Sequence, residues 1–272
     1  MNFDRVAGIY DDTRGLPQPV LDAVSSSIVR ATNAGPETRF LELGIGTGRI
    51  ALPLLQYGFP YTGVDISADM MQRLMAKVPP SADNLTLVEG DVSDLPFGDD
   101  SFDVVLSVHL LHLVPAWRTV LEEIRRVLAP NGCYVHGGNE HGDSSPSGEI
   151  RRRWREIASE LGAEFRPSYG SREAVETALT ESGARLAVYR VVQWEGEVRP
   201  LDLIEALRQR AFSMTWDLPD AIMDATNERM VQWANERFED PSQPVATSEE
   251  FDFTVARWTH NLRNSGGEDH TT

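Results

Sequence analysis

The sequence has little of several things that would place it in particular classes of protein. Cys133 is its only cysteine, so no intrachain disulfide can form and a secreted disulfide framework is excluded. Lys77 is its only lysine, which we interpret as a coding bias. Positive charge is outnumbered, with 25 Lys and Arg residues against 42 Asp and Glu residues and a formal net charge of −17. Such a surface repels phosphate backbones and anionic lipid, so nucleic acid and membranes are poor candidates as main partners.

Long hydrophobic runs are also missing. The most apolar stretch, residues 104–114, is interrupted by Ser107, His109 and His112. It is well short of the ~20 residues that a membrane-spanning helix needs. The first residues show no basic stretch followed by an apolar run, so we expect no secretory signal. A cytoplasmic protein in a reducing compartment fits these features.

What is present is the composition of an ordinary globular protein, with 41% hydrophobic and 25% charged residues. From residue 40 to about 138, short apolar runs alternate with helical patterns, which is typical of βα units in a parallel sheet. We predict an α/β fold with a doubly wound, mostly parallel seven-stranded sheet and helical cap insertions in its C-terminal part. The expected strands are residues 40–43, 61–64, 85–88, 103–108, 134–136, 185–194 and 251–258.

A glycine-rich loop follows the first expected strand, with Gly44, Gly46 and Gly48 in the pattern Gly-x-Gly-x-Gly. It leads into a helix, where the backbone must turn sharply and can approach a ligand closely. Asp65 ends the second expected strand, where an acid can accept both hydroxyls of a ribose. The pattern therefore predicts a nucleotide-like ligand. A dinucleotide fingerprint would need glycine where Arg49 stands, which weakens the alternative of a nicotinamide-dependent oxidoreductase.

Further segments carry a resemblance to a known family. Asp91 follows the third expected strand, and Leu-Pro-Phe at 95–97 and Asp-Val-Val at 103–105 lead into the fourth. With the glycine loop, these make residues 36–138 resemble the class I S-adenosylmethionine-dependent methyltransferases, especially the small-molecule type related to quinone-biosynthesis methyltransferases. The resemblance implies methyl transfer from S-adenosylmethionine to O, N or C of a small-molecule acceptor, with S-adenosylhomocysteine as product. Asn131 stands where the family commonly has glycine, and asparagine also tolerates a left-handed backbone.

The resemblance implies one group of residues around the methionine part of the cofactor. These are Glu42, Gly44, Gly46 and Gly48, and Ser107 would close the pocket. The methyl donor is a sulfonium cation, so a carboxylate near it is favourable, and no metal is required for an in-line displacement. We expect no metal site.

A second implied group surrounds the ribose and adenine. Asp65 would hold the ribose and Ile66 would pack on the adenine. Asp91, with the backbone of Val92, would read the adenine amino group. All four follow the second or third expected strand, so they are expected at the same edge of the sheet.

Two more groups are candidates for closing the site and for moving a proton. Tyr10 and Arg14 resemble a segment that folds over the cofactor in many of these enzymes, although an exposed N-terminal helix would fit equally well. His109, after the fourth strand, and His141, in an expected loop at 139–148, are candidates for a general base. A solvated loop is the alternative for His141.

These expectations divide the chain into four segments. Residues 1–35 would form N-terminal lid helices and 36–139 the S-adenosylmethionine-binding core. Residues 140–263 would supply cap helices and the closing strands, and 264–272 a disordered tail. The cap would select the acceptor through apolar and aromatic side chains, unless these are plain core. We expect a monomer or a homodimer. A catalytically inactive cofactor-binding regulator stays open as an alternative. The cap side chains expected to select the acceptor are Trp154, Phe165, Phe212, Met214 and Trp216.

Overall fold

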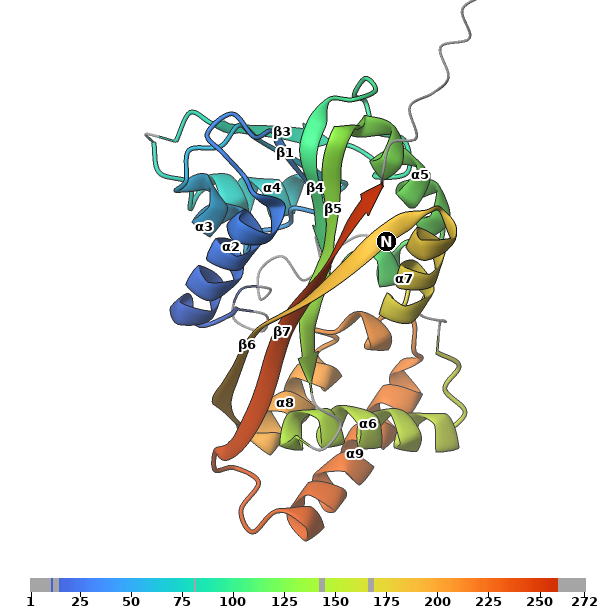
Figure 1. Cartoon of the computed structure of the whole chain (residues 1–272). Coiled ribbons are helices and arrows are strands. Elements are labelled where there is room, and N and C mark those ends of the chain that lie inside the picture. Colours follow the sequence, from blue (N-terminus) through green and yellow to red (C-terminus); the bar gives the residue numbers. More distant parts are fainter. Residues whose placement is uncertain (1–10, 12–14, 81, 142–144, 166–168, 259–272) are drawn as a thin grey trace, which may run out of the picture.

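A computed structural model describes residues 11, 15–80, 82–141, 145–165 and 169–258 of the chain. Seven strands form one sheet in the order β3-β2-β1-β4-β5-β7-β6, and β7 runs antiparallel to both of its neighbours (Figure 1). The order reverses between β1 and β4, which is the kind of switch point where open α/β sheets bind ligands. The predicted doubly wound, mostly parallel sheet is confirmed. Its strands are β1 (Phe40–Leu43), β2 (Tyr61–Asp65), β3 (Leu85–Glu89), β4 (Phe102–Val108), β5 (Leu128–His141), β6 (Ala184–Val198) and β7 (Val245–Trp258).

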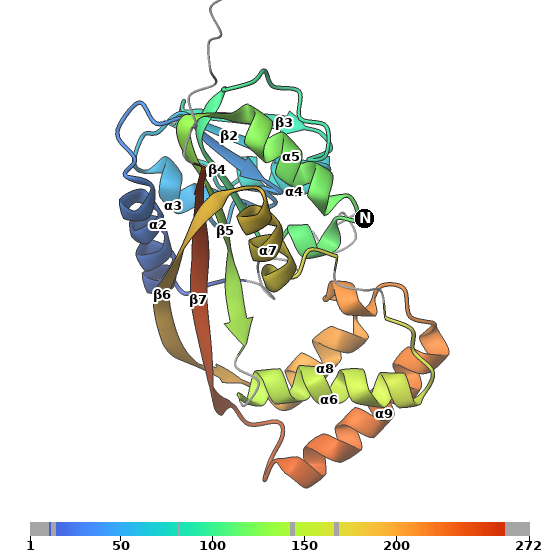
Figure 2. The same ribbon diagram turned by 45° about the vertical axis from the view of Figure 1, so that its right-hand side comes forward.

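Helices cover both faces of this sheet (Figure 2). On one face, α2 (Gln18–Thr32), α3 (Ala51–Leu55) and α4 (Ala68–Met75) pack into a core that includes Phe40 and Leu106. Local signals explain their limits. Ser67 caps α4 by accepting a hydrogen bond from the Met70 N–H at 3.2 Å, and Pro79-Pro80 follows its end.

The opposite face is covered by α5 (Trp117–Val127) and α7 (Arg172–Glu181), whose apolar side chains pack against Leu41 and Tyr134. Cys133 lies buried in the sheet, and burial raises the pKa of its thiol to about 11. A buried thiol whose pKa is raised is poorly suited to act as a nucleophile.

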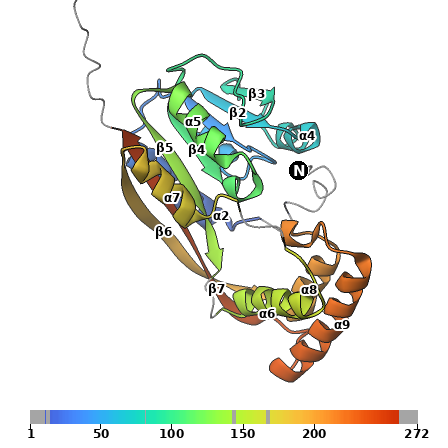
Figure 3. The ribbon, with the colours of Figure 1, turned by 90° about the vertical axis from the view of Figure 1, so that its right-hand side faces the viewer.

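A separate helical cap lies at the far end of the long strands. It consists of α6 (Pro146–Glu160), α8 (Pro200–Arg208), the short 3-10 helix η3 (Ser213–Thr215) and α9 (Asp220–Arg237), which enclose an apolar core of their own. Figure 3 shows these helices below the sheet, joined to it by the extended ends of β5, β6 and β7.

The expected loop at 139–148 is wrong over its first residues, and also over its last residues, because α6 begins at Pro146. β5 continues to His141, because β7 runs beside it and pairs Asn139 with Phe251 and His141 with Glu249. Glycine and serine in the sequence signalled a turn, but an antiparallel neighbour supplies the hydrogen-bond partners that keep the backbone extended. The closing strands β6 and β7 are longer than expected for the same reason.

Candidate functional site

A pocket opens at the carboxyl edge of the sheet, where β1, β2, β3 and β4 end. Its empty volume, including the part open to solvent, is about 870 Å³. The structure thus brings together residues that the sequence predicted from four separate strands. The lining residues are Gly44, Gly46, Asp65, Ile66, Met70, Gly90, Asp91, Val92, Val108, His109, Leu110, Leu113, Val114 and Pro115.

The glycine loop turns under this pocket through left-handed backbone conformations. Gly46 has φ 54° and Gly48 has φ 82°, values that side-chain-bearing residues rarely adopt. Gly46 lines the pocket, whereas Gly48 faces the protein: a Cβ there would stand 2.2 Å from Cδ1 of Leu74 in α4. The two glycines therefore serve different purposes, one toward the pocket and one in loop–helix packing.

Asp65 ties the second strand to the glycine loop. Its Oδ2 accepts a hydrogen bond from the Gly46 N–H at 2.8 Å, and its Oδ1 accepts one from the Ser67 N–H at 2.9 Å. Both bonds hold the carboxylate in one orientation at the pocket wall. The expected role of Asp65 at a ribose stays a prediction.

The next part of the wall combines an exposed apolar side chain with a second carboxylate. Ile66 lines the pocket yet is 57% exposed, so a flat ring packed on it would remove a large apolar side chain from water. Asp91 accepts hydrogen bonds from the N–H and hydroxyl of Ser93 at 2.8 and 2.7 Å, and these bonds lower the pKa of its carboxyl. Asp91 therefore stays ionised beside Val92 at this wall.

The same part of the chain matches a known family. Residues 41–136 match the family model described as a methyltransferase domain. The match covers less than half of the chain, so residues 41–136 are similar to a methyltransferase domain. This segment holds the glycine loop and the residues after β1 to β4 that line the pocket.

Named relatives match less than half of this chain. A fatty-acid O-methyltransferase of Mycolicibacterium smegmatis is 38% identical over 100 residues, which are 36% of this chain and 36% of that protein. A phthiotriol/phenolphthiotriol dimycocerosates methyltransferase of Mycobacterium tuberculosis is 34% identical over 116 residues, 43% of this chain and 40% of that protein. The matches span less than half of these relatives, and the cap lies outside the matched family segment.

The fold extends further than the sequence similarity. The YcgJ protein of Bacillus subtilis has a TM-score of 0.59 with this chain at 16% identity, covering 87% of this chain and 98% of that one. The two proteins therefore share the fold.

Glu42 of the methyltransferase domain lies behind the pocket wall and is not one of its lining residues. Its side chain is buried in the sheet and accepts a hydrogen bond from the Tyr61 hydroxyl at 2.6 Å. Burial raises the pKa of this carboxyl to about 8. The side chain is thus directed toward Tyr61 of β2, and its implied place beside the methionine part of the cofactor stays a prediction.

Ser107, implied to close the pocket, is likewise not one of the residues that line it. It is fully buried, lies 2.6 Å from the Tyr134 hydroxyl and 3.4 Å from His136 Nδ1, and belongs to a polar cluster inside the sheet. Side chains alternate between faces along a strand, so Val108, its neighbour, lines the pocket instead.

His109 reaches the pocket directly after β4, as predicted. It has φ 55°, an uncommon conformation for a residue with a side chain. Its N–H donates to the carbonyl of Gly137 in β5 at 3.2 Å. The backbone of His141 belongs to β5, four residues beyond Gly137, so it stands farther along the extended strand than the expected loop would place it. Tyr10, Arg14 and the side chain of His141 lie outside the described residues.

One polar contact near the glycine loop was missed by sequence reasoning. Thr47 donates to Asp11 Oδ1 at 2.5 Å, and Lys77 Nζ donates to Asp11 Oδ2 at 2.8 Å. Burial alone would raise the pKa of Asp11, but hydrogen bonds from Lys77 and Thr47 lower it. The only lysine of the chain thus holds a residue of the expected lid segment.

Most of the aromatic side chains of the cap belong to its apolar core. Trp154 is fully buried and Phe212 is buried in the same apolar cluster, while Phe165 packs edge-on against Trp154 at 6.3 Å between ring centroids.

Among the described residues, none of the helices is long and apolar enough to cross a membrane. In the same part of the chain no three His, Cys, Asp or Glu side chains gather as metal ligands would.

Proposed function

We propose that this protein transfers a methyl group from S-adenosylmethionine to O, N or C of a small-molecule acceptor. The observation that carries the proposal is the convergence of Gly46, Asp65, Ile66, Asp91 and Val92 on one pocket inside the matched methyltransferase domain. An inactive regulator would also bind the cofactor, so transfer itself is the property to test.

The residues present fit the cofactor in chemical type. Gly46 brings bare backbone to the pocket, Asp65 offers an anchored carboxylate for the ribose, and Ile66 offers an exposed apolar surface for the adenine. S-adenosylmethionine supplies an electrophilic methyl group on a sulfonium sulfur. The role of the protein is then to hold the methyl donor and the acceptor in line. This lowers the barrier to methyl transfer, because the entropy cost of alignment is met on binding.

We propose an apolar acceptor. The wall formed by Val108, Leu110, Leu113 and Val114 is apolar, and Pro115 extends it. Two relatives of the domain carry names of methyltransferases that act on fatty acids and on phthiotriol-type lipids. The net charge of −17 disfavours a nucleic-acid acceptor.

His109 is the candidate base for acceptors that must lose a proton, because it lines the pocket. His141 is a second candidate on the strand that leads toward the cap.

We further propose that the protein acts in the cytoplasm as a monomer or homodimer, with residues 1–35 as lid, 36–139 as cofactor core and 140–263 as cap and closing strands. Light scattering of the purified chain tests the oligomeric state.

The test of the function is transfer of a labelled methyl group. Purified protein with methyl-labelled S-adenosylmethionine is incubated with a fatty acid, a phenol, an amine or a small-molecule extract of cells, and S-adenosylhomocysteine is measured. Label in an organic-soluble product with equal S-adenosylhomocysteine supports the proposal. Tight cofactor binding without transfer to any fraction would instead favour the regulatory protein.

A further inference from the structure

The connection between β3 and β4, residues 90–101, carries pocket residues but contains no helix or strand. It begins at Gly90, whose N–H donates to the Asp65 carbonyl at 3.0 Å, and continues through Asp91 and Val92 at the pocket. A segment without regular structure needs other partners for its backbone groups if it is to hold one position.

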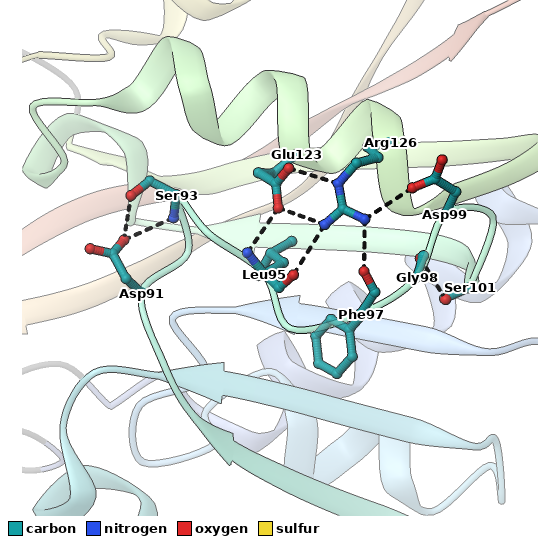
Figure 4. Close-up of polar contacts among 9 residues, drawn as sticks. All are labelled: Asp91, Ser93, Leu95, Phe97, Gly98, Asp99, Ser101, Glu123 and Arg126. Atoms are coloured by element: carbon teal, nitrogen blue, oxygen red, sulfur yellow. Dashed lines mark hydrogen bonds and ion pairs between the residues drawn. The ribbon is translucent and has the colours of Figure 1, made fainter.

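Two side chains of α5 supply those partners (Figure 4). Glu123 and Arg126 form a two-pronged pair, with Arg126 Nε 2.8 Å from Oε1 and Nη2 2.7 Å from Oε2. Glu123 Oε2 accepts the Leu95 N–H at 2.8 Å, and Arg126 Nη2 donates to the Leu95 carbonyl at 3.1 Å. Leu95 is thus held at both of its backbone polar groups.

Arg126 holds the rest of the connection as well. Its Nη1 donates to the Phe97 carbonyl at 2.7 Å and to Asp99 Oδ1 at 3.1 Å, and its own carbonyl accepts the Asp100 N–H at 3.1 Å. Hydrogen bonds from Arg126 lower the pKa of Glu123, so the pair stays ionised at neutral pH. An ion pair that also satisfies backbone groups does more than an ordinary surface pair, whose two charges interact mainly through water.

Apolar contacts with α5 also hold this segment. Val92 and Leu95 are 8% and 4% exposed and pack in one cluster with Trp117 and Val120 of α5. Only three residues separate Asp91 from Leu95, so a shift of Leu95 is passed to the pocket through a short, turned stretch of chain. The Asp94 N–H to Asp91 carbonyl bond of 3.1 Å keeps that stretch turned.

We propose that Glu123 and Arg126 are positioning residues that set the place of Asp91 and Val92, and thereby the selection of adenine over other bases in the cofactor. The inference rests on the proposed function, because it needs the adenine to lie beside Asp91. Neither side chain lines the pocket, so their effect on the ligand is through the segment that they hold.

The experiment compares two ligands that differ at one position of the base. S-adenosylhomocysteine carries an amino group where S-inosylhomocysteine carries an oxygen. Kd values for both are measured by calorimetry for the parent, Arg126→Met and Glu123→Gln. We expect the parent to prefer the adenine ligand by at least about tenfold, and each variant to lower that ratio by at least about threefold.

A matched control separates positioning from general loss of stability. Arg237 of the cap makes the same two-pronged pair with Glu149, at 2.8 and 3.0 Å, far from the pocket. Arg237→Met loses the same type of ion pair as Arg126→Met. Because this pair does not hold the pocket segment, the ratio should stay within about twofold of the parent. Thermal unfolding of every variant is recorded alongside.

A folded Arg126→Met protein that keeps the parental ratio of the two Kd values overturns the inference. A parent with no preference for the adenine ligand overturns it too. If Arg126→Met does not fold, Arg126→Lys is used, which keeps the positive charge but loses the two-pronged geometry of the guanidinium. A ratio equal to the parent's in Arg126→Lys also overturns the inference. A parent that binds neither ligand overturns the proposed function, and this inference with it.

Discussion

The ring of His109 lies against the backbone of Gly138. A Cβ on residue 138 would stand 2.9 Å from His109 Cε1, closer than any side-chain contact allows. His109 has φ 55° and donates its N–H to the Gly137 carbonyl, so β5 holds both its backbone and its ring. A strained residue held this firmly at a pocket is a candidate for function.

We expect His109→Ala or His141→Ala to lower the turnover rate by at least about tenfold while cofactor affinity stays near that of the parent. The reason is that a general base typically contributes about 10² to 10⁴ in rate, and an imidazole is the natural proton acceptor at neutral pH. Steady-state rates and calorimetric affinities measured on the same preparations check this.

Gly138→Ala serves as a companion to these variants. It keeps the imidazole of His109 but must displace it, so we expect a fall in rate similar to that of His109→Ala if the ring position matters. Normal turnover in both histidine variants would mean that neither is the base, and that an amine acceptor deprotonated by solvent is the better account.

Asp65→Ala should weaken S-adenosylmethionine and S-adenosylhomocysteine together, because both contain the ribose. Losing a carboxylate that accepts two hydroxyl bonds should cost about 1.5 to 3 kcal/mol, or roughly one to two decades in affinity. Calorimetry measures it. Asp69→Ala, an equal change of charge at an exposed position of α4, should leave both affinities unchanged. A folded Asp65→Ala protein with parental affinity would remove Asp65 from the site.

Gly46→Val should abolish cofactor binding in a chain that still folds. Gly46 has φ 54°, which a branched side chain resists, and its Cβ would lie at the pocket beside Met70. Gly58→Val is the control, because Gly58 has φ 78° with no atom within 4 Å of its Cβ position. It should carry the same backbone strain and bind normally. Binding by well-folded Gly46→Val would contradict the assignment of the glycine loop.

Glu42 should make the stability of the fold depend on pH. The pKa of its carboxyl is raised by burial from 4.5 to about 8, so the folded state binds a proton that the unfolded state has released between these values. Its contribution is therefore fully present below about pH 4.5 and is lost as the pH rises through about 8.

Glu42→Gln tests this dependence, since the amide keeps the shape and carries no charge. The free energy of unfolding, measured in urea at pH 5, 6.5 and 8, should decline less steeply with pH in Glu42→Gln than in the parent. Parallel curves for the two proteins would show that burial does not shift this carboxyl as described.

The sequence by itself determined the elements of the cofactor side of the molecule. Apolar runs at 40–43 and 61–64, with Gly46 between them and Asp65 after them, predicted two strands and the loop that the structure shows. Asn131, expected to tolerate a left-handed backbone, has φ 68°. These features depend on local conformation and on hydrophobic alternation, which the order of residues specifies directly.

Tertiary structure alone decided which of these side chains reach the pocket. Glu42 and Ser107 are buried in the sheet, where neighbouring strands bring the hydroxyls of Tyr61 and Tyr134 within hydrogen-bonding distance of them. The extension of β5 depends on β7, more than a hundred residues later in the chain. The hydrogen bonds from Arg126 to the carbonyls of Leu95 and Phe97 likewise join residues about 30 positions apart. Such contacts arise from packing and strand register between distant segments, and no local pattern in either segment encodes them.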